Sequence, residues 1–404
     1  MALIPVAEAL QRVLADAKRL RTEVVSLDEA FGRLLTEDVI ALRTQPPAAV
    51  SAMDGYAVRA SDVAQAPVVL KVIGQVAAGH PFTGKVGPGE AARIFTGGIM
   101  PEGTDTVVIQ ELTTQDENGV TIQKPTPAGR NVRGEGIDFA ERQTLLRKGR
   151  RLSARDLMLA AAMNHSRLSV YRKPTVAILG TGDELVPPGG SPRPGEIVYS
   201  NGFALAALAR SNGAKAHDLG IARDRIEDIA AAVRRARELN ADILLTSGGA
   251  SVGEHDLVQR ALAAEGLELS FWRVALRPGR PMLHGRLGAM QVLGVPGNPV
   301  SAYVCAFLFL GPLIRKLAGR SDSDIVDLPQ PARLGRDLPA NDERADYLRA
   351  TIEETRNGLV ATPLPAQDSS LMAPLAKADC LLIREPHAPA AAAGSDCIIL
   401  KLGL

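Results

Sequence analysis

The chain has 404 residues, of which 46% are hydrophobic and 23% are charged. This length and this balance exclude a single small module, a disordered chain and a collagen-like fibre. Forty-six basic against forty-five acidic residues give a formal charge of +1, so we expect no general attraction to nucleic acid or to an anionic membrane.

The first 43 residues and residues 139–172 are predicted to form one helical framework domain. Apolar side chains from Val6 to Leu20 follow helical spacing and predict an amphipathic N-terminal helix. The SLDE run that begins at Ser26 is typical of a capping box and predicts a second, shorter helix. We expect a third helix over 153–163, packed with the N-terminal helices.

Residues 44–138 have a different residue pattern. Short β-branched runs such as VVLKVIG, TDTVVIQEL and GVTIQK alternate with glycine and proline, which is typical of a small all-β module. Because helical segments flank this stretch on both sides, we predict a β domain inserted in the helical framework.

Residues 173–322 repeat a pattern of strand, loop and helix, as in TVAILG followed by GFALAALARS. This pattern predicts βαβ units in a largely parallel, doubly wound sheet. Residues 323–404 return to short strands and prolines and predict a C-terminal β domain. The predicted fold class is therefore multidomain α/β plus β: a doubly wound α/β domain, an inserted β domain, a helical framework domain and a C-terminal β domain.

The cysteines and the apolar segments bear on the cellular compartment. Cys305, Cys380 and Cys397 lie in apolar surroundings without metal-site spacing, and we expect small buried residues. The opening MALIPVAEAL lacks the basic region of a secretory signal. The apolar stretch 300–314 is too short to cross a bilayer and predicts a core helix. Together these features predict a cytoplasmic protein.

Ligands of open α/β sheets bind where the strands end, so the loops that follow the strands are the first candidates for a site. GTGDEL begins at Gly180, TSGGASVGEHD at Thr246 and GVPGNPVSA at Gly294. Glycines in one such loop are more often there for backbone geometry, but three loops at one sheet edge favour a binding site. Gly248 and Gly249 have amides that could cradle an anion.

A set of acidic residues lies in loops along the chain: Asp54, Asp138, Glu184, Asp224 and Asp256. Such carboxylates suit Mg²⁺ that is shared with a phosphate ligand. A plain turn-forming role explains Asp54 equally well. Arg277 and Arg280 flank a Pro-Gly turn and suit an oxyanion, although isolated arginines are usually solvated surface residues. The histidines form no zinc motif, and no catalytic triad is evident.

Taken in order, the motifs PPAAVSAMDGYAV, FTGGIMPEGTDTVV, GRNVRGEGIDF, ILGTGDELV, TSGGASVGEHD, RPGRPM and GVPGNPVSA resemble those of the MoeA family, the molybdopterin molybdenumtransferases related to the gephyrin E domain. The resemblance implies an elongated homodimer of four-domain subunits in which the α/β domain binds molybdopterin. It also implies the activity: molybdate and adenylylated molybdopterin are the substrates, Mg²⁺ assists, and AMP is released as the molybdenum cofactor forms.

The resemblance also implies roles for individual residues. Its catalytic positions match Asp54, Thr96, Asp138, Glu184, Asp224 and Asp256, with Glu184, Asp224 and Asp256 as metal ligands. Its substrate-binding positions match Gly248, Gly249, Ser251, Arg277, Arg280, Pro296, Asn298, Pro299, Ser301, Arg349 and Ser369. The chain departs from the family pattern twice, with Arg280 where lysine is usual and with Gln367-Asp368-Ser369-Ser370 in place of Gln-Gly-Ser-Gly.

Two other functions remain open at this point. A molybdopterin adenylyltransferase has a similar α/β domain, but the flanking β domains argue against it. A non-catalytic molybdopterin-binding scaffold is allowed by the gephyrin resemblance, but it has no need of five matched acids. We also expect a molybdopterin adenylyltransferase and molybdoenzyme delivery proteins as possible partners, and neither nucleic acid nor a membrane.

Overall fold

The computed structural model describes residues 3–248 and 257–403. The chain divides into two compact units. The first comprises Met1–Glu23, Gly32–Thr36 and Ser169–Leu404, and the second comprises Val24–Phe31 and Glu37–Leu168. Two of the dividing points fall inside strands β1 (Thr22–Ser26) and β12 (Arg167–Tyr171), which pair with each other.

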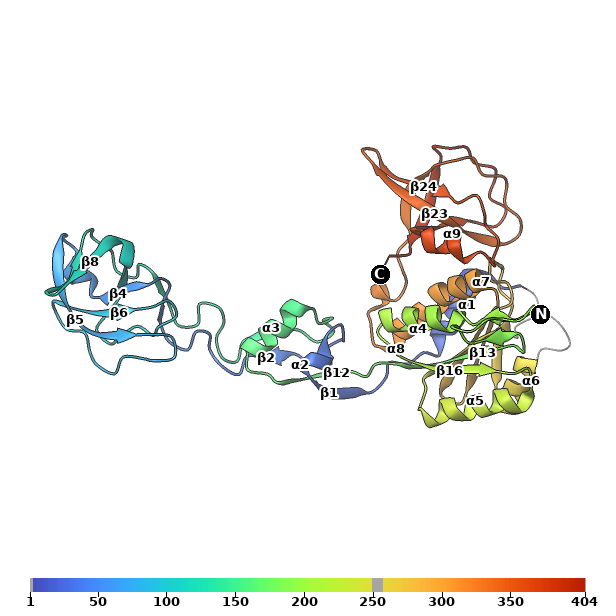
Figure 1. Ribbon diagram of the computed structural model, residues 1–404, viewed down its shortest axis with the longest axis horizontal. Helices are drawn as coiled ribbons and strands as arrows, with labels where there is room; N and C mark the ends of the chain where they lie inside the picture. Colours follow the sequence, from blue (N-terminus) through green and yellow to red (C-terminus); the bar gives the residue numbers. More distant parts are fainter. Residues whose placement is uncertain (1–2, 249–256, 404) are drawn as a thin grey trace. The chain divides into compact units, whose positions relative to one another are not determined.

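The second unit contains a six-stranded sheet with the order β7-β4-β6-β5-β9-β8 (Figure 1). Its strands are β4 (Gly55–Val58), β5 (Val68–Val76), β6 (Glu90–Ile94), β7 (Thr106–Ile109), β8 (Thr113–Asp116) and β9 (Gly119–Ile122). Neighbours run antiparallel except β5 and β6. Tyr56 and Val58 belong to one apolar cluster and Ala57 to another, as side-chain alternation along a strand requires. The inserted β sheet predicted from the sequence is present.

The rest of the second unit consists of short elements. They are α2 (Leu27–Ala30), α3 (Ala154–Ala162), β2 (Val39–Ile40) paired with β11 (Thr144–Leu146), β3 (Val50–Ser51) paired with β10 (Val132–Arg133), and the 3-10 turns η1 (Ala60–Val63) and η2 (Gln110–Leu112). Helix α2 contacts α3. Ser26 is the N-cap of α2 as predicted, but its side chain forms no capping hydrogen bond.

The N-terminal helix differs from the prediction in length and in packing. It is α1 (Val6–Ala15) and ends before Leu20. Its buried residues Ala9 and Val13 belong to the same apolar cluster as Leu313 and Ile314, so α1 packs within the first unit. The physical reason is that the apolar face of α1 packs against the long apolar helix over residues 299–317.

The first unit contains a six-stranded sheet with the order β16-β13-β17-β21-β20-β18. Strands β16 (Lys215–Ala222), β13 (Thr175–Thr181), β17 (Ile243–Ser247) and β21 (Met290–Val295) are parallel. Strands β20 (Leu283–Leu287) and β18 (Glu268–Trp272) complete one edge in the antiparallel sense. Every residue of β13 is buried, because both faces of the sheet are covered by helices.

Different helices cover the two faces of this sheet. Ile178 of β13 packs in a cluster with α1, α4 (Asn201–Ser211) and the long apolar helix, whereas Leu179 packs in a cluster with α5 (Ile226–Glu238) and α6 (Leu257–Ala264). Figure 1 shows α4 and α5 on opposite sides of β13 and β16. This arrangement confirms the predicted doubly wound α/β domain.

The long apolar helix is built from α7 (Pro299–Cys305), a π-helical segment η3 (Ala306–Leu310) and α8 (Gly311–Leu317). Pro312 lacks the N–H that would continue the α-helical pattern, and the Gly311 N–H bonds five residues back, to the Ala306 carbonyl. Although the helix is long and apolar enough to cross a membrane, it is mostly buried. It is therefore the core helix that the sequence predicts.

The C-terminal segment forms a sheet with the order β19-β23-β24-β22-β26-β25, in which β23 also pairs with β25. The second pairing closes β22 (Gln330–Leu334), β23 (Ala345–Thr355), β24 (Gly358–Pro363), β25 (Cys380–Arg384) and β26 (Asp396–Lys401) into a barrel. The edge strand β19 (Leu276–Arg277) comes from the segment between β18 and β20. Other elements are β14 (Leu185–Val186) paired with β15 (Ile197–Val198), α9 (Met372–Lys377) and η4 (Asp322–Asp324).

Ser153→Ala tests the one complete capping box found in the second unit's helices. Ser153 is the N-cap of α3: its hydroxyl accepts the Asp156 N–H, and Asp156 accepts the Ser153 N–H at 2.8 Å. Desolvation raises the pKa of Asp156, but hydrogen bonds from Ser153 outweigh it and keep the pKa below its usual range. We expect the substitution to lower the free energy of unfolding by about 1 kcal/mol, measured by urea denaturation followed by circular dichroism.

Ser26→Ala is the matched control, because Ser26 is an N-cap residue whose side chain makes no capping bond. It should cost less than Ser153→Ala. Equal losses for the two variants would contradict the assignment of the stabilisation to the capping box of α3.

Candidate functional site

The parallel strands β13, β17 and β21 end at one edge of the sheet of the first unit. Their registers pair Gly180 with Ser247 and Ser247 with Val295, so the three predicted loops leave the sheet side by side. A cavity of about 520 Å³ lies at this edge. Its lining is Thr181, Glu184, Leu185, Ile197, Val198, Tyr199, Ser200, Asn201, Ser247, Gly248, Pro281, Pro296, Gly297, Asn298, Pro299, Ser370 and Met372.

Tyr199 occupies a space that two glycines leave open. A Cβ at Gly180 would lie 2.5 Å from the Tyr199 ring, and a Cβ at Gly202 would lie 2.0 Å from the Tyr199 hydroxyl oxygen. The hydroxyl donates to Asp218 at 3.3 Å, while burial and that carboxylate raise the pKa of the phenol. Tyr199 thereby fixes the chain that connects β15 to α4 against the end of β13.

Asn201 connects two of the three loops. Its Nδ2 donates to the Ser247 hydroxyl at 2.8 Å and to the Gly297 carbonyl at 2.8 Å. The side-chain amide therefore joins the end of β17 to the loop after β21. Gly248, which follows directly, has φ +101, and a Cβ there would lie 2.3 Å from the Thr181 carbonyl oxygen. This close approach explains the need for glycine at that position.

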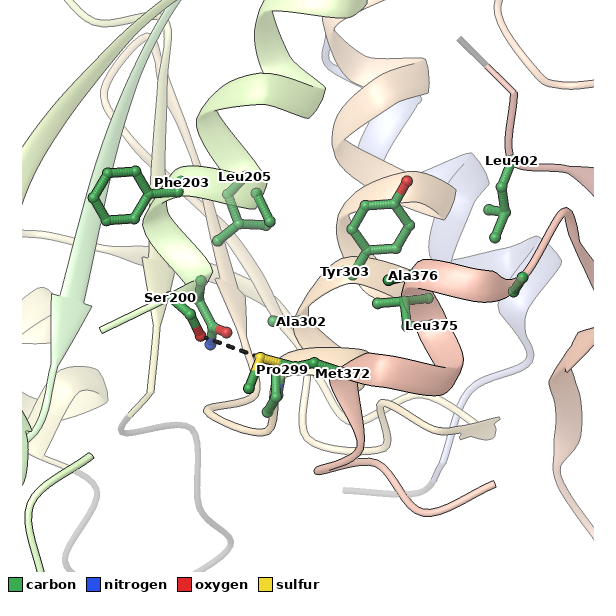
Figure 2. Close-up of a pocket in the computed structure, with 13 residues that line it drawn as sticks. Ser200, Phe203, Leu205, Pro299, Ala302, Tyr303, Met372, Leu375, Ala376 and Leu402 are labelled. Atoms are coloured by element: carbon green, nitrogen blue, oxygen red, sulfur yellow. Dashed lines mark hydrogen bonds between the residues drawn. The ribbon is translucent and has the colours of Figure 1, made fainter. Parts of the chain in front are cut away.

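The start of the long apolar helix meets a loop of the C-terminal barrel segment. Asn298 is the N-cap of α7, and its Nδ2 donates to the Ser369 hydroxyl at 2.9 Å. The Val300 N–H donates to the Ser369 carbonyl at 3.1 Å. Ser301 is buried. Of the residues predicted to bind substrate, Pro296, Asn298 and Pro299 line the cavity. Ser301 and Ser369 lie outside the lining. Pro299 also lines a second pocket, which Figure 2 shows.

Glu184 and Asp224 lie on neighbouring loops. The Asp224 N–H donates to Asp183 Oδ1 at 3.2 Å, and the Gly182 N–H donates to the Ala222 carbonyl at 3.2 Å. Glu184 lines the cavity, and Asp224 lies outside the lining. Both side chains are exposed, so their oxygens are accessible to a cation. The structure thus places the loops of two predicted metal ligands side by side.

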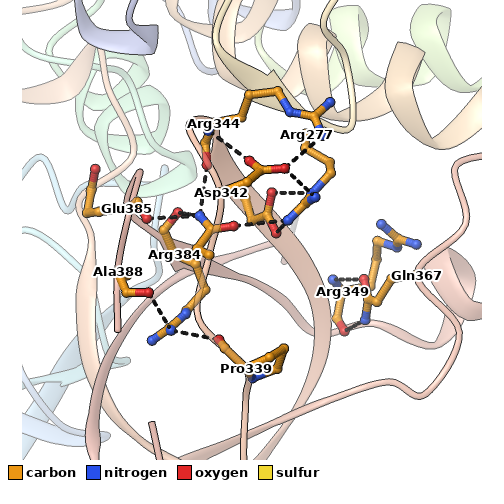
Figure 3. Close-up of polar contacts among 11 residues, drawn as sticks. Arg277, Pro339, Asp342, Arg344, Arg349, Gln367, Arg384, Glu385 and Ala388 are labelled. Atoms are coloured by element: carbon orange, nitrogen blue, oxygen red, sulfur yellow. Dashed lines mark hydrogen bonds and ion pairs between the residues drawn. The ribbon is translucent and has the colours of Figure 1, made fainter. Parts of the chain in front are cut away.

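Arg277 and Arg280 have different surroundings, although the sequence suggested a pair. Arg277 Nε donates to Asp346 at 2.5 Å and Nη1 to Asp342 at 2.9 Å, while Nη2 bonds Asp346 and Asn341 (Figure 3). The hydrogen bond with Asp346 raises the pKa of Arg277. The charge of Arg277 is thus paired with two carboxylates, and its role as an oxyanion host stays a prediction.

Arg280 is exposed and precedes Pro281 of the cavity lining. No ion pair of Arg280 is found within 3–248 and 257–403. The turn before it is tightly supported, because a Cβ at Gly279 would lie 2.5 Å from the Cys305 sulfur. Arg280 itself lies outside the cavity lining, and its role as an oxyanion host stays a prediction.

Arg349 is a buried cation in strand β23, with 1% of its surface exposed. Its Nη2 donates to the Asp368 carbonyl at 3.1 Å, and Gln367 bonds both its N–H and its carbonyl (Figure 3). Desolvation lowers the pKa of Arg349. It lies outside the cavity lining, so its contact with the Asp368 loop, next to Ser369, is its connection to the site.

Asp54, Thr96 and Asp138 lie in the second unit. Asp54 Oδ1 accepts the Thr96 N–H at 2.7 Å and the Thr96 hydroxyl at 2.8 Å. The backbone hydrogen bond from Thr96, followed by its side-chain bond, keeps the pKa of Asp54 low. Asp138 is exposed, and its N–H donates to the Gln45 carbonyl. Thr96 thus fixes the position of the Asp54 carboxylate through two hydrogen bonds.

Three predicted site residues, Gly249, Ser251 and Asp256, lie outside the described residues. Among the residues that are described, no group of three or more His, Cys, Asp or Glu side chains could hold a metal ion. Cys305 and Cys380 are buried as predicted and Cys397 is half-buried. Burial raises the pKa of all three thiols, that of Cys380 to about 12, so they stay protonated at neutral pH.

Sequence reasoning missed several residues of the cavity, above all Tyr199, Asn201 and Ser247. The signal that could have found them is weak. Tyr199 and Asn201 stand in YSNGF, at the start of a helix that follows a short strand, and Ser247 precedes the Gly248 motif. Their role depends on contacts between loops that are far apart in the sequence.

Three family models of known proteins together match nearly the whole chain. Residues 4–164 match the family model of the MoeA N-terminal region (domains I and II), residues 177–316 that of a probable molybdopterin binding domain, and residues 331–402 that of the MoeA C-terminal region (domain IV). A curated relative from Haemophilus influenzae named molybdopterin molybdenumtransferase is 34% identical over 388 residues, covering 94% of this chain and 93% of the relative. The chain belongs to the MoeA family.

Other MoeA relatives agree with this assignment. A molybdopterin molybdenumtransferase from Bacillus subtilis is 35% identical, covering 94% of this chain and 90% of the relative. A crystal structure of a molybdopterin biosynthesis MoeA protein from Pyrococcus horikoshii matches with a TM-score of 0.81 and 30% identity, covering 100% of both chains. The resemblance drawn from the sequence motifs is confirmed.

Gly202→Ala tests whether Tyr199 needs the space that Gly202 leaves open in this MoeA family chain. The added methyl group would overlap the phenol, so the ring must shift. We expect the free energy of unfolding to fall by about 1–3 kcal/mol, measured by urea denaturation. Phosphate binding, measured by calorimetry, should weaken as well, because Tyr199 lines the cavity.

Gly311→Ala is the matched control. Gly311 is a buried glycine in helix α8, and its nearest neighbour would be at 3.4 Å. Alanine there should be neutral or slightly stabilising. If Gly202→Ala had no greater effect than Gly311→Ala, the contact between Gly202 and the Tyr199 phenol would not constrain the structure.

Proposed function

We propose that this chain inserts molybdenum from molybdate into molybdopterin, and that the cavity at the ends of β13, β17 and β21 is its reaction site. The name molybdopterin molybdenumtransferase of its full-length relatives supports this activity. The observation that carries the placement is the convergence of three glycine-containing loops, the Asn201 bridge and Glu184 on one cavity.

We propose further that molybdopterin arrives in adenylylated form and that AMP is released. Such a substrate carries a pyrophosphate, and a cavity with backbone amides of glycine loops and an exposed arginine nearby suits that anion. Arg280 is the candidate host for a phosphate or for molybdate, because its side chain is exposed and the next residue, Pro281, lines the cavity. Molybdenum receives its sulfur ligands from the substrate, so the buried cysteines are not required.

Mg²⁺ is the cation proposed for this site. Glu184 and Asp224 offer exposed carboxylate oxygens on adjacent loops, and Mg²⁺ typically binds one or two carboxylates together with substrate phosphates. The donor set therefore fits, with Asp256 as the third proposed ligand. When bound, Mg²⁺ would neutralise charge on the phosphate oxygens. The protein's own residues orient the substrate, and Asp183 holds the Asp224 loop through the Asp224 N–H.

The alternative functions are less well supported. In an adenylyltransferase the α/β domain would suffice, yet here Ser370 and Met372 from the C-terminal segment complete the cavity lining. A scaffold would not require the Asp54 carboxylate and the Thr96 hydroxyl that two hydrogen bonds hold together. We therefore retain molybdenum insertion and place it in the cytoplasm, where protonated, unpaired cysteines are stable.

The proposed activity is tested with purified protein, adenylylated molybdopterin, molybdate and Mg²⁺, with AMP release as the measurement. We expect AMP release to require Mg²⁺ and to fall roughly 100-fold in Glu184→Gln, because charge stabilisation at the phosphate is lost. Glu238→Gln changes an exposed carboxylate at the end of α5 and should leave the rate unchanged. Wild-type protein that releases no AMP under these conditions would refute the proposed function.

We propose that the active protein is a homodimer in which Asp54 of the partner subunit faces the cavity of this chain. The motive is chemical: the second unit carries Asp54, Thr96 and Asp138, whereas the first unit carries the glycine loops, Glu184 and Asp224. Neither unit alone has a complete set of groups. A molybdopterin adenylyltransferase and molybdoenzymes are the proposed donor and acceptor partners.

The shared site predicts complementation. Asp54→Ala and Asp224→Ala should each inactivate the homodimer. Mixed dimers of the two variants, formed by dissociation and reassembly and confirmed by mass, should regain up to half of the wild-type AMP release. In such a dimer one site carries both substitutions and the other carries neither. Mixed dimers without activity would show that each site lies within one chain.

A further inference from the structure

The pair of Asp54 and Thr96 lies where two strands of the second unit meet. Asp54 directly precedes β4, and the start of β4 pairs with the end of β6, Gly55 with Ile94. Both hydrogen bonds from Thr96 end on the same carboxylate oxygen, Oδ1. The position of this pair therefore depends on what holds the two strand ends together.

Arg93 of β6 is the charged residue at this junction. It lies opposite Tyr56 of β4, and its guanidinium carbon is 5.1 Å from the centroid of the Tyr56 ring and 4.9 Å from that of the Phe95 ring. The Tyr56 hydroxyl donates to Gln115 at 2.7 Å, which fixes that ring. Contact with two aromatic rings favours a cation at this place, and Phe95 directly precedes Thr96.

The terminal nitrogens of Arg93 bond to the residues that hold the backbone of Asp54. Nη1 donates to the Gly55 carbonyl at 3.2 Å, and Nη2 donates to Gln110 Oε1 at 2.7 Å. Gly55 follows Asp54 in the chain, and the Gln110 N–H donates to the Asp54 carbonyl at 3.1 Å. A planar guanidinium offers both donors in a fixed geometry, so one side chain links two neighbours of Asp54.

The backbone at this point has little freedom. A Cβ at Gly55 would lie 1.9 Å from the Val108 carbonyl oxygen, so β4 and β7 approach each other closely beside Asp54. Hydrogen bonds from Thr96 lower the pKa of Asp54, and the positive charge of Arg93 also lowers it. The charge of Arg93 thus acts on the carboxylate while its terminal nitrogens bond to the surrounding chain.

We propose that Arg93 is a positioning residue for Asp54, whose carboxylate it holds, together with Thr96, in the geometry that the reaction needs. This proposal rests on the proposed function, in which Asp54 belongs to the reaction site. Nη1 and Nη2 already donate to oxygens of the protein, so Arg93 acts through Asp54 and is not a host for the substrate anion.

Arg93→Met and Arg93→Lys test the proposal in the full chain, with AMP release measured over a range of adenylylated molybdopterin concentrations. We expect Arg93→Met to lower kcat about tenfold or more and to leave KM within about twofold of the wild type, because substrate binding is intact and the reacting geometry is lost. Arg93→Lys keeps the charge beside the two rings but lacks the planar fork, so its kcat should be intermediate.

Arg147→Met is the matched control. Arg147 is an exposed arginine of the same unit that forms an ion pair with Asp38. This variant should have the kcat and the KM of the wild type, since an exposed ion pair contributes little.

Hydrogen exchange gives a readout that does not depend on activity. The Thr96 and Gln110 N–H groups both donate to Asp54, so their exchange reports on how firmly Asp54 is held. We expect these two amides to exchange about tenfold faster in Arg93→Met, measured by mass spectrometry, while the amides of β9 in the same sheet exchange as in the wild type. Faster exchange throughout the sheet would show that Arg93 only stabilises the fold.

Three further results would overturn the proposal: an unchanged kcat in Arg93→Met, a raised KM with an unchanged kcat, which would make Arg93 a substrate host, or an equal loss of kcat in Arg147→Met. Each can occur while the wild-type protein releases AMP, so failure of the positioning role is distinguishable from failure of the proposed function. If the wild-type protein released no AMP, the exchange rates of Thr96 and Gln110 would still decide whether Arg93 holds Asp54.

Discussion

The parallel pairing of β13 with β17, and of β17 with β21, is the constraint on which the site depends. Parallel strands bring their carboxyl ends to the same edge of a sheet, so loops separated by more than a hundred residues become neighbours. Burial of β13 on both faces fixes its register, because a slip by one residue would exchange the side chains of the two apolar clusters. The loops can then carry glycines and polar residues that a core could not accommodate.

Close packing around glycines converts that edge into a cavity of defined shape. Tyr199 fills the space above Gly180 and Gly202, Gly248 lies against the Thr181 carbonyl, and Gly279 lies against the Cys305 sulfur. Each contact leaves no room for a Cβ. The glycines therefore act as contact points between segments as well as flexible positions of the chain.

The C-terminal barrel participates in the site through two connections. Arg277 of β19 forms ion pairs with Asp346 of β23 and with Asp342, and the Ser369 loop bonds the start of α7. Asp346 is almost fully buried, so an unpaired carboxylate there would be costly. The pairing gives Arg277 a structural role at the junction with the barrel, and Arg280 is the exposed arginine of the turn.

The sequence by itself determined the elements and the motifs. Periodicity separated the inserted β sheet from the βαβ segment, and motif order indicated the MoeA family, because strand alternation, helical spacing and glycine-containing turns are local properties of the chain. Tertiary structure alone decided that α1 packs on α8, that Arg277 is paired while Arg280 is exposed, and that Tyr199 and Asn201 belong to the cavity. These facts depend on which surfaces meet in space, and residues such as Arg277 and Asp346, 69 positions apart, carry no local signal of their contact.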